Sequence, residues 1–363
     1  MKKKAVVAMS GGVDSSVAAA LLVERGYDVT GIMLKLWRGE AANNNSGCCN
    51  LGAAEDARRV ADVLGIPFYV LNFAEHFEDT VIRNFHDDYA AGRTPNPCVR
   101  CNQWVKFGAL LERAETLGAD VLATGHYARV VQGPSGRFSL LRGLDPNKDQ
   151  SYVLWMLSQR ELAKTLFPVG DMHKSETRAF AEELGLRTAA KPDSQEICFV
   201  RDGDLPAYVD HNIRSAPGPL VDGSGTQLGE HAGIARYTVG QRRGLGIALG
   251  KPVFVTSVDA GTNTVTVGER HELEVGRLRV DETSFTGSLL DEGTRVLVQH
   301  RAHGEVSPAS VVEVTGDSLE VAFDRPVLAI APGQSAAFYS EERPEILLGG
   351  GVIARTVPVR LTA

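Results

Sequence analysis

The chain opens with a strand, a glycine-rich loop and a helix, and this succession constrains the fold more than any other feature. Lys4–Met9 is a short apolar run of strand type, and Asp14–Glu24 has helical periodicity. The alternation continues through Val29–Lys35, Ala54–Leu64, Phe68–Asn72, Val105–Leu117 and Val121–Thr124. Because successive βαβ units place parallel strands in one sheet covered by helices, the first part of the chain is predicted to be an α/β domain with a doubly wound parallel sheet.

The rest of the chain has the pattern of β structure. Turn signals multiply after about residue 203, including Ala216–Pro219 and Asp222–Gly225. Runs typical of strands follow at Pro252–Val258, Asn263–Val267, Leu278–Val280, Thr294–His300, Ser307–Val314 and Ser318–Phe323. We therefore expect the α/β domain over residues 1–202, a small central β-rich domain over 203–275 and a C-terminal β-barrel over 276–363. Since domains fold as units, removing the residues after about 276 is expected to leave the first domain intact.

Composition excludes several classes of protein. No apolar run approaches the roughly 20 residues that span a bilayer, and the opening MKKK is not followed by a signal-peptide pattern. We therefore expect a cytoplasmic protein without a membrane partner. The net charge of −7 argues against a non-specific nucleic-acid binder but leaves room for a specific one with a local basic patch.

Residues Ser10–Ser16 read SGGVDSS and lie where a parallel sheet binds its ligands, at the carboxyl end of a strand. Glycines allow the backbone to approach a phosphate, and the N–H groups at a helix start point toward it. Asp14 is suited to holding Mg²⁺ or to capping the helix. The alternative to a phosphate-binding loop is that these residues form an ordinary N-cap turn at the start of a helix. The pattern is neither a Walker A loop nor G-x-G-x-x-G, because it lacks their required residues.

Five cysteines in a chain of this length do not indicate a structural disulfide framework. Cys98 and Cys101 have C-x-x-C spacing just before an expected helix, where a thiol has a lowered pKa and is more nucleophilic. Cys198 lies between Ile197 and Phe199, and by itself it is equally well explained as a small core residue. No role is assigned to Cys48 and Cys49.

Two resemblances extend this interpretation. SGGVDSS resembles the PP-loop of the N-type ATP pyrophosphatases, which cleave ATP between the α and β phosphates. Together, the following motifs resemble the MnmA family of tRNA-specific 2-thiouridylases over nearly the whole chain: SGGVDSS, GRTPNPCVRCN, ATGHYAR, RGLDPNKDQSYVL, DSQEICF, TVGQRRGLGI, PGQSAAFY and LGGGVI. Any one of these motifs would be a weak signal, and their joint order is specific.

The resemblance implies a sulfur transfer to tRNA. ATP would adenylate O2 of the wobble uridine, and sulfur would then be delivered to C2. Cys101 matches the family nucleophile, and Cys198 matches the cysteine that carries a persulfide. A disulfide between the two is also implied, as is a cysteine desulfurase or a sulfur-carrier protein as sulfur donor.

The resemblance also assigns binding residues. ATP, with Mg²⁺, would contact Ala8, Met9, Ser10, Gly11, Gly12, Val13, Asp14, Ser15, Leu34 and Gly125. The target base would meet Asn96, Pro97 and Cys98. The rest of the tRNA would contact His126, Lys148, Asp149, Gln150, Arg301, Ala302 and Gln334.

One position departs from the family pattern. Many members have Asp where this chain has Cys98, which puts a general acid–base role at this position in doubt. Cys98, Cys101 and Cys198 then make a set of three thiolates that is an alternative ligand set for an Fe–S cluster or Zn²⁺. Two other functions are considered: a PP-loop ligase acting on a small molecule, and a tRNA-binding protein without catalysis. The first leaves the paired cysteines and the β domains unexplained, and the second does not need SGGVDSS.

Overall fold

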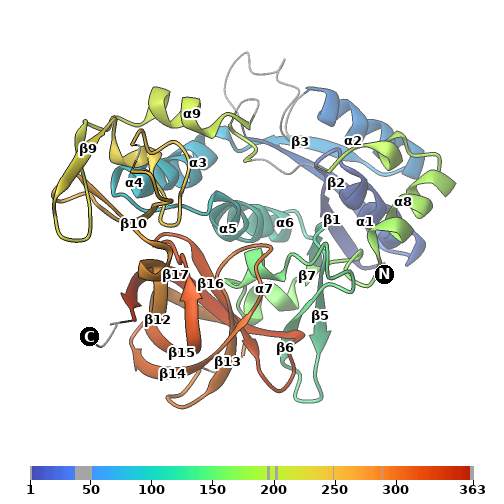
Figure 1. Cartoon of the computed structure of the whole chain (residues 1–363). Helices are drawn as coiled ribbons and strands as arrows, with labels where there is room; N and C mark the ends of the chain where they lie inside the picture. Colours follow the sequence, from blue (N-terminus) through green and yellow to red (C-terminus); the bar gives the residue numbers. More distant parts are fainter. Residues whose placement is uncertain are drawn as a thin grey trace.

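The computed structural model describes residues 2–36, 51–193, 197–200, 203–247, 249–287 and 289–359. In Figure 1 the parallel sheet and its helices lie on one side, the central β domain lies opposite, and a β-barrel lies beneath both. No helix in these ranges combines the length and apolar character needed to cross a bilayer.

The first domain is built on a five-stranded parallel sheet. Its strand order is β3 (Phe68–Asn72), β2 (Asp28–Lys35), β1 (Lys4–Ala8), β4 (Val121–Ala123) and β7 (Thr165–Leu166). Alternate residues of β1 enter different cores, because Ala5 and Val7 pack with one hydrophobic cluster and Val6 with the other. Both faces of the sheet are therefore covered, which confirms the predicted α/β class.

Helices cover the two faces of this sheet. The helices α1 (Val13–Glu24), α2 (Leu51–Leu64) and α8 (Lys174–Glu183) contribute buried residues such as Val17, Ala57 and Ala181 to one cluster. The other face is covered by the chain between β3 and β4, which contains α3 (Ala74–Phe77), η2 (Glu78–Ile82), α4 (Arg83–Ala90), α5 (Pro97–Arg100), η3 (Cys101–Leu110) and α6 (Leu111–Thr116). The shorter elements that follow are η4 (Ser151–Leu154), α7 (Gln159–Ala163) and η5 (Arg187–Ala190).

The helix predicted from Val105 begins earlier. Asn96 accepts a hydrogen bond from the Val99 amide at 3.3 Å, and Pro97 occupies the first helical position. Proline is favoured there because its missing N–H would have no helical partner. From Cys101 to Leu110 the helix has the wider π geometry, and it then continues as α6. Cys98 and Cys101 therefore lie within the first turns of one continuous helix.

The central domain contains one sheet of four strands. Their order is β10 (Phe254–Asp259), β11 (Thr264–Gly268), β8 (Gly218–Val221) and β9 (Gln227–His231). The helix α9 (Leu205–Asn212) precedes the sheet, and η7 (Ile234–Arg236) follows β9. Leu220, Val255 and Val265 are fully buried and form a small core of their own.

The C-terminal domain is a closed six-stranded barrel, as predicted, entered after η8 (Arg270–Leu273). It consists of β12 (Glu274–Phe285), β13 (Arg295–Gln299), β14 (Ser307–Thr315), β15 (Ser318–Leu328), β16 (Ser335–Ser340) and β17 (Ile346–Pro358). The order β12-β15-β14-β13-β16-β17 closes because β12 also pairs with β17. Closure leaves no edge strand among the six, and buried residues such as Leu278, Val296 and Phe338 fill the interior.

The barrel is joined to the first domain more closely than the sequence indicates. A hairpin of β5 (Ala128–Gln132) and β6 (Phe138–Arg142) belongs to the first part of the chain, yet β6 pairs with β17 and extends the barrel sheet. Tyr339 and Leu347 of the barrel belong to the largest core cluster of the first domain. The expectation that the first domain stays intact without the residues after about 276 therefore conflicts with this shared core.

Candidate active site

The SGGVDSS loop lies between the end of β1 and the start of α1. Gly11 has a φ of +71°, and a Cβ there would lie 2.2 Å from the carbonyl oxygen of Ala53, so only glycine fits. Ser15 and Ser16 both donate their hydroxyls to the Gly12 carbonyl, at 3.1 and 2.8 Å. The Ser10 amide donates to the Ser15 hydroxyl at 3.2 Å. These bonds hold the loop in a compact turn around the helix start.

The loop has the neighbours that the sequence predicted for an ATP site. Gly125 follows β4, and a Cβ there would lie 2.6 Å from the Ser15 amide nitrogen, so this turn packs directly against the start of α1. Leu34 is near the end of β2, the strand adjacent to β1. The predicted set Ala8–Ser15, Leu34 and Gly125 thus converges on one edge of the sheet, and ATP binding by this set stays a prediction.

Asp14 is held by partners from distant segments. Its carboxylate accepts hydrogen bonds from Lys174 Nζ at 2.7 and 2.8 Å and from the Tyr127 hydroxyl at 2.8 Å. Burial raises the pKa of Tyr127, so its hydroxyl stays protonated and donates. Lys174 begins α8, 160 positions from Asp14 in the sequence, and its side chain is 10% exposed. The loop therefore sits beside a buried positive charge.

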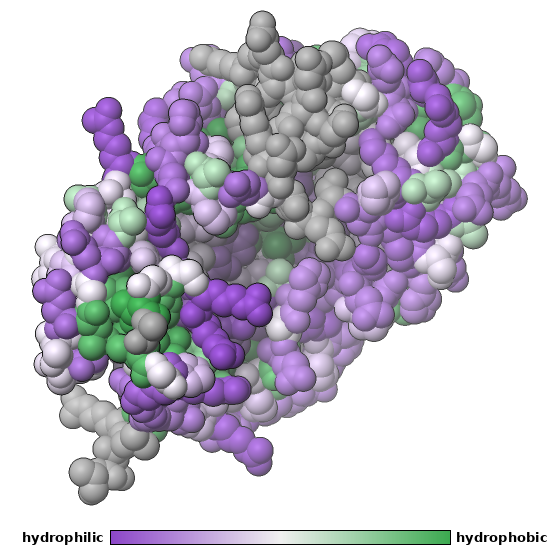
Figure 2. Space-filling model, turned by 45° about the horizontal axis from the view of Figure 1, so that its top comes forward, coloured by the Kyte–Doolittle hydropathy of each residue, from purple (hydrophilic) through white to green (hydrophobic). Residues whose placement is uncertain are grey.

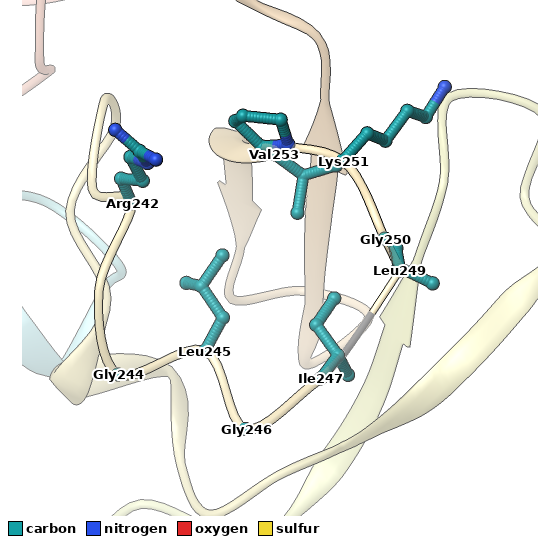
Figure 3. A pocket seen from close by; sticks show the side chains of 10 residues that line it. Arg242, Gly244, Leu245, Gly246, Ile247, Leu249, Gly250, Lys251 and Val253 are labelled. Carbon is teal, nitrogen blue, oxygen red and sulfur yellow. The ribbon is translucent and has the colours of Figure 1, made fainter.

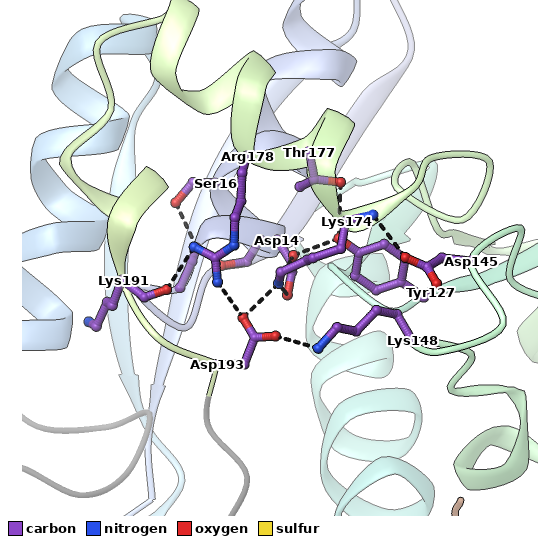
Figure 4. Close-up of polar contacts among 12 residues, drawn as sticks. Asp14, Ser16, Tyr127, Asp145, Lys148, Lys174, Thr177, Arg178, Lys191 and Asp193 are labelled. Atoms are coloured by element: carbon purple, nitrogen blue, oxygen red, sulfur yellow. Dashed lines mark hydrogen bonds and ion pairs between the residues drawn. The ribbon is translucent and has the colours of Figure 1, made fainter.

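Asp193 lies close to three cationic side chains beside the SGGVDSS loop (Figure 4). Its carboxylate lies 2.7 Å from Lys148 Nζ, 2.8 Å from Lys174 Nζ and 2.9 Å from the Arg178 guanidinium. Burial by itself would raise the pKa of Asp193, but the hydrogen bonds and charges of Lys148 and Lys174 outweigh it and lower the pKa to about 2. This carboxylate is therefore ionised throughout the neutral range.

Sequence reasoning missed Lys174, Arg178 and Asp193. The first two are four positions apart on α8 and so share one helix face, which was a detectable signal. Nothing in the local sequence indicated that this face meets the SGGVDSS loop.

The predicted tRNA contacts Lys148, Asp149 and Gln150 have partners within the protein. Lys148 binds Asp193, as above. Asp149 accepts hydrogen bonds from Arg142 at 2.6 Å and from the Gly143 amide at 3.0 Å. Gln150 accepts one from the Tyr127 amide at 3.1 Å. The backbone between Gly143 and Ser151 is thereby fixed, and contact of these three residues with tRNA stays a prediction.

His126 is enclosed rather than presented to solvent. Its side chain packs near Phe107 and Phe167, and Nδ1 lies 2.6 Å from the Thr124 hydroxyl. Burial, reinforced by the nearby charge of Lys106, holds the pKa of His126 well below its usual value, so the imidazole is neutral. The predicted role of His126 in tRNA binding remains to be tested.

The segment predicted to meet the target base lies where all three domains touch. The Thr94 amide donates to the Pro332 carbonyl of the barrel at 2.8 Å, and its hydroxyl donates to Thr238 of the central domain at 3.2 Å. Gln334 donates from Nε2 to the carbonyls of Thr94 and Pro95, at 3.1 and 2.9 Å. Asn96, Pro97 and Cys98 follow directly, and Cys98 is exposed.

Arg301 and Ala302 lie on the connection from β13 to β14 and are both exposed. Gln299 Nε2 donates to the carbonyls of Arg301 and Ala302, at 3.0 and 3.1 Å. The barrel thus presents these two residues on an ordered turn. Figure 2 shows that one face of the molecule is hollowed near its centre, with mostly hydrophilic residues around the hollow.

The described cysteines differ in exposure. Cys101 is buried and belongs to the largest hydrophobic cluster, and the partly buried Cys198 packs against the same cluster. Neither forms a disulfide in this structure, so the implied Cys101–Cys198 bond is not present here. Within the described residues, no group of three or more His, Cys, Asp and Glu side chains is arranged to hold a metal ion, so the three thiols do not form a ligand set in this arrangement. Cys48 and Cys49 lie outside the described residues.

A separate pocket of about 600 Å³ lies in the central domain. Figure 3 shows its lining, which comes from the chain between η7 and β10: Arg242, Gly244, Leu245, Gly246, Ile247, Leu249, Gly250, Lys251, Pro252 and Val253. None of these residues belongs to the SGGVDSS loop or to the cysteine-bearing helix. The pocket is therefore distinct from the candidate active site.

The parallel sheet, the SGGVDSS loop and the two β domains define a multidomain protein of the PP-loop class. Three family models match consecutive parts of the chain: tRNA methyl transferase HUP domain over 3–202, tRNA methyl transferase PRC-barrel domain over 206–269 and aminomethyltransferase beta-barrel domain over 275–353. The chain belongs to the family of tRNA-specific 2-thiouridylases, MnmA.

The relatives cover almost the whole chain. The MnmA protein of Acidothermus cellulolyticus is 49% identical, with coverage of 97% of this chain and 98% of the relative. That of Geobacter metallireducens is 48% identical, with coverage of 97% of each. Among solved structures, a 4-thiouridine synthetase–RNA complex with bound ATP has a TM-score of 0.36 and 17% identity, over 58% of this chain and 50% of that chain.

Proposed function

We propose that this protein is a tRNA-uridine 2-sulfurtransferase that acts in the cytoplasm. It adenylates O2 of the wobble uridine with ATP, transfers sulfur to C2, and releases AMP and pyrophosphate. The observation that carries the proposal is that the SGGVDSS loop, Cys101 and Cys198 belong to one domain, with both thiols at the same hydrophobic cluster. Family membership over nearly the full length supports the same reaction.

The loop supplies the adenylation half of the reaction. Gly11 and Gly12 leave the backbone open to a phosphate, and the free N–H groups at the start of α1 point toward it. Asp14 offers carboxylate oxygens, the ligands that Mg²⁺ prefers, and would hold the ion that accompanies ATP. Such an ion offsets the charge of the triphosphate. Lys174 neutralises Asp14 in this structure, so metal and lysine would share the carboxylate.

The cysteines supply the sulfur half. A cysteine desulfurase or a sulfur-carrier protein places a sulfane sulfur on Cys198. Its terminal sulfur attacks C2 of the adenylated base, and AMP leaves with the former O2 oxygen. The Cys101 thiolate then attacks Sγ of Cys198, which frees the sulfur on C2 and closes a Cys101–Cys198 disulfide. A dithiol reductant restores both thiols before the next turnover.

The three-domain junction presents the base. A wobble base is unpaired in the anticodon loop and is able to leave its stack, as enzymes acting on single bases require. Thr94 and Pro95 are held by the barrel and the central domain, so Asn96 and Cys98 sit at a fixed place beside both. Arg301 on the barrel turn is suited to a phosphate contact that orients the tRNA.

The proposal predicts tRNA-dependent formation of AMP and pyrophosphate. Asp14→Ala should reduce adenylation at least about 100-fold, because the metal and Lys174 lose their shared carboxylate. Product analysis with and without tRNA measures this. Glu24→Ala, on the exposed end of the same helix, is the control and should keep full activity. Release of ADP and phosphate, or formation of AMP that does not depend on tRNA, would contradict the proposal.

A further inference from the structure

A network of hydrogen bonds joins the first domain to the barrel at Arg142, the last residue of β6. Its Nη1 donates to the Asp149 carboxylate at 2.6 Å, and its Nη2 donates to the side-chain oxygen of Gln299 at 3.0 Å. Its Nε donates to the Pro344 carbonyl at 3.2 Å. The guanidinium carbon also lies 3.6 Å from the centre of the Tyr339 ring. All three guanidinium nitrogens thus have partners, and the planar group is held in one orientation.

On the first domain, this network holds the segment Lys148–Gln150. The Asp149 side chain is 7% exposed. It also accepts hydrogen bonds from the Gly143 amide and from the amide and hydroxyl of Ser151, at 3.0, 3.0 and 2.9 Å. The Ser151 hydroxyl lies 2.9 Å from the Tyr339 hydroxyl of the barrel. The Asp149 carboxylate is therefore engaged with the protein itself, and its effect is to fix the backbone on either side of it.

On the barrel, the same network holds the turn that contains Arg301 and Ala302. Gln299 ends β13 and is 4% exposed. Its side-chain oxygen accepts from Arg142, while its Nε2 donates to the carbonyls of Arg301 and Ala302, at 3.0 and 3.1 Å. Glutamine is suited to this place because one amide group supplies both an acceptor and two donor hydrogens. One buried side chain therefore links the first domain to the backbone of an exposed turn.

We propose that Arg142 and Gln299 are positioning residues that set the distance between two tRNA-contacting segments, Lys148–Gln150 on the first domain and Arg301–Ala302 on the barrel. The inference rests on the proposed function, because it takes both segments as contacts for tRNA. Two contacts held at a fixed distance bind one large ligand more tightly than two independent contacts, since the second then loses little further freedom. Arg142 and Gln299 act through the segments and do not themselves bind the tRNA.

The test is the affinity of the full-length protein for a tRNA transcript with uridine at the wobble position. Gln299→Met keeps the length of the side chain but removes the acceptor and both donors, so tRNA affinity should fall about tenfold. Arg142→Lys keeps the charge but loses the planar fork that reaches Asp149 and Gln299 together, so it should have a similar effect. The KM for tRNA should rise accordingly, while kcat and the KM for ATP stay within about twofold.

The matched control is Gln227→Met in the central domain. Gln227 is an exposed glutamine that also donates to a backbone carbonyl, that of Gly229, at 3.1 Å. Because it lies outside the network, its replacement should leave tRNA affinity unchanged.

Combination with Arg301→Ala separates positioning from a loss of stability. If Gln299 acts by holding the turn, Arg301→Ala should lower tRNA affinity several-fold in the wild type but less than about twofold in the Gln299→Met background. Two effects that simply multiply would overturn the proposal. Arg142→Lys, combined with Arg301→Ala in the same way, covers the case in which Gln299→Met does not fold, because Arg142 is partly exposed. Wild-type tRNA affinity in either folded single variant would also overturn it.

Binding of tRNA needs no chemical step, so the two proposals fail separately. Weakened tRNA binding in the variants as predicted, with no AMP formed by the wild type, would end the proposed function and keep the positioning role. AMP formation by the wild type with tRNA, together with unchanged tRNA affinity in both variants, would do the reverse.

Discussion

At the residue scale, the thiols of the first domain differ in exposure, and their roles are separable. Cys198→Ser should stop thiolation while adenylation of tRNA continues, because the ATP loop is unaffected. Cys101→Ser should also block thiolation, by at least about 100-fold, yet Cys198 should still accept sulfane sulfur from a desulfurase. Radiolabelled sulfur on the protein and AMP release measure the two steps separately. Loss of adenylation in either folded variant would contradict this division of roles.

Cys98 distinguishes the relay from a metal cluster. Cys98→Asp restores the residue that many relatives of this family carry, so a persulfide relay should keep substantial activity. The change would replace a soft ligand with a hard one in a three-thiolate cluster and weaken iron binding. The deciding measurement is thiolation by metal-free protein with a desulfurase and cysteine under anaerobic conditions. Turnover only after cluster reconstitution would overturn the relay.

Individual site residues were predictable where the chemistry is local. SGGVDSS places its glycines, serines and Asp14 by short-range turn and cap geometry, so pattern alone located them. Lys174 was not predictable, because it reaches Asp14 across 160 positions of sequence through the packing of α8 on α1. The pairing of Asp193 with three cations was not predictable for the same reason, because it depends on how separate segments pack together.

At the element scale, the helix that carries Cys101 is tied to the barrel by an ion pair. The two terminal guanidinium nitrogens of the buried Arg100, Nη1 and Nη2, donate to the Glu282 carboxylate of β12, at 2.7 and 2.8 Å. Hydrogen bonding to Arg100 lowers the pKa of Glu282. Glu282→Gln should therefore lower the free energy of unfolding by about 1–2 kcal/mol at neutral pH. The effect is no larger because Glu282 is half exposed and solvent screens much of the ion pair.

The pH dependence of this cost follows from the direction of the shift. A carboxyl whose pKa is lowered by folding stabilises the native state above its usual pKa, 4.5 for Glu, and loses that contribution as the pH falls through the lowered value. The difference between wild type and Glu282→Gln should stay constant above pH 4.5 and shrink below it. Urea unfolding across this range measures it, with the exposed Glu292→Gln as control. A difference that grows at acid pH would refute the assignment.

Element boundaries were predicted best where periodicity and capping agree. Phe68–Asn72 matches β3 as expected, and Asp14–Glu24 differs from α1 by one residue. The helix at Cys101 was placed too late, because the capping of Asn96 and the proline after it outweigh the weak apolar period before Val105. The hairpin of β5 and β6 gave no clear signal, since β6 is stabilised by pairing with the distant β17 and β5 by pairing with β6.

At the scale of the whole molecule, the three expected regions are present as a parallel sheet, a small β sheet and a barrel, while their boundaries at 202 and 275 stay predictions. What the sequence did not indicate is how far the barrel and the first domain share one core. Tyr152 donates its hydroxyl to the Ser335 carbonyl at 2.9 Å, and a Cβ on Gly350 would lie 2.6 Å from the Trp155 ring. Such close approaches fix the barrel against the first domain.

A chain that ends at residue 276 should therefore fail to fold cooperatively. Removing the barrel would expose Trp155, Tyr152 and Leu140, all buried in the whole protein, and losing the burial of each large apolar side chain costs about 1.5–3 kcal/mol. It would also leave β6 without its partner β17. Thermal unfolding and gel filtration of the truncated chain measure this, and we expect aggregation or a broad transition.

The matched comparison keeps the barrel and changes only its surface. Arg301→Ala removes an exposed cation from the turn after β13, so the fold should persist while tRNA affinity falls several-fold and becomes less dependent on salt. A truncated chain that unfolds sharply and binds ATP like the whole protein would show that the barrel is an independent module. Misfolding on truncation, together with a folded Arg301→Ala variant of weakened tRNA binding, would show that the barrel both completes the catalytic core and presents its own surface to the tRNA.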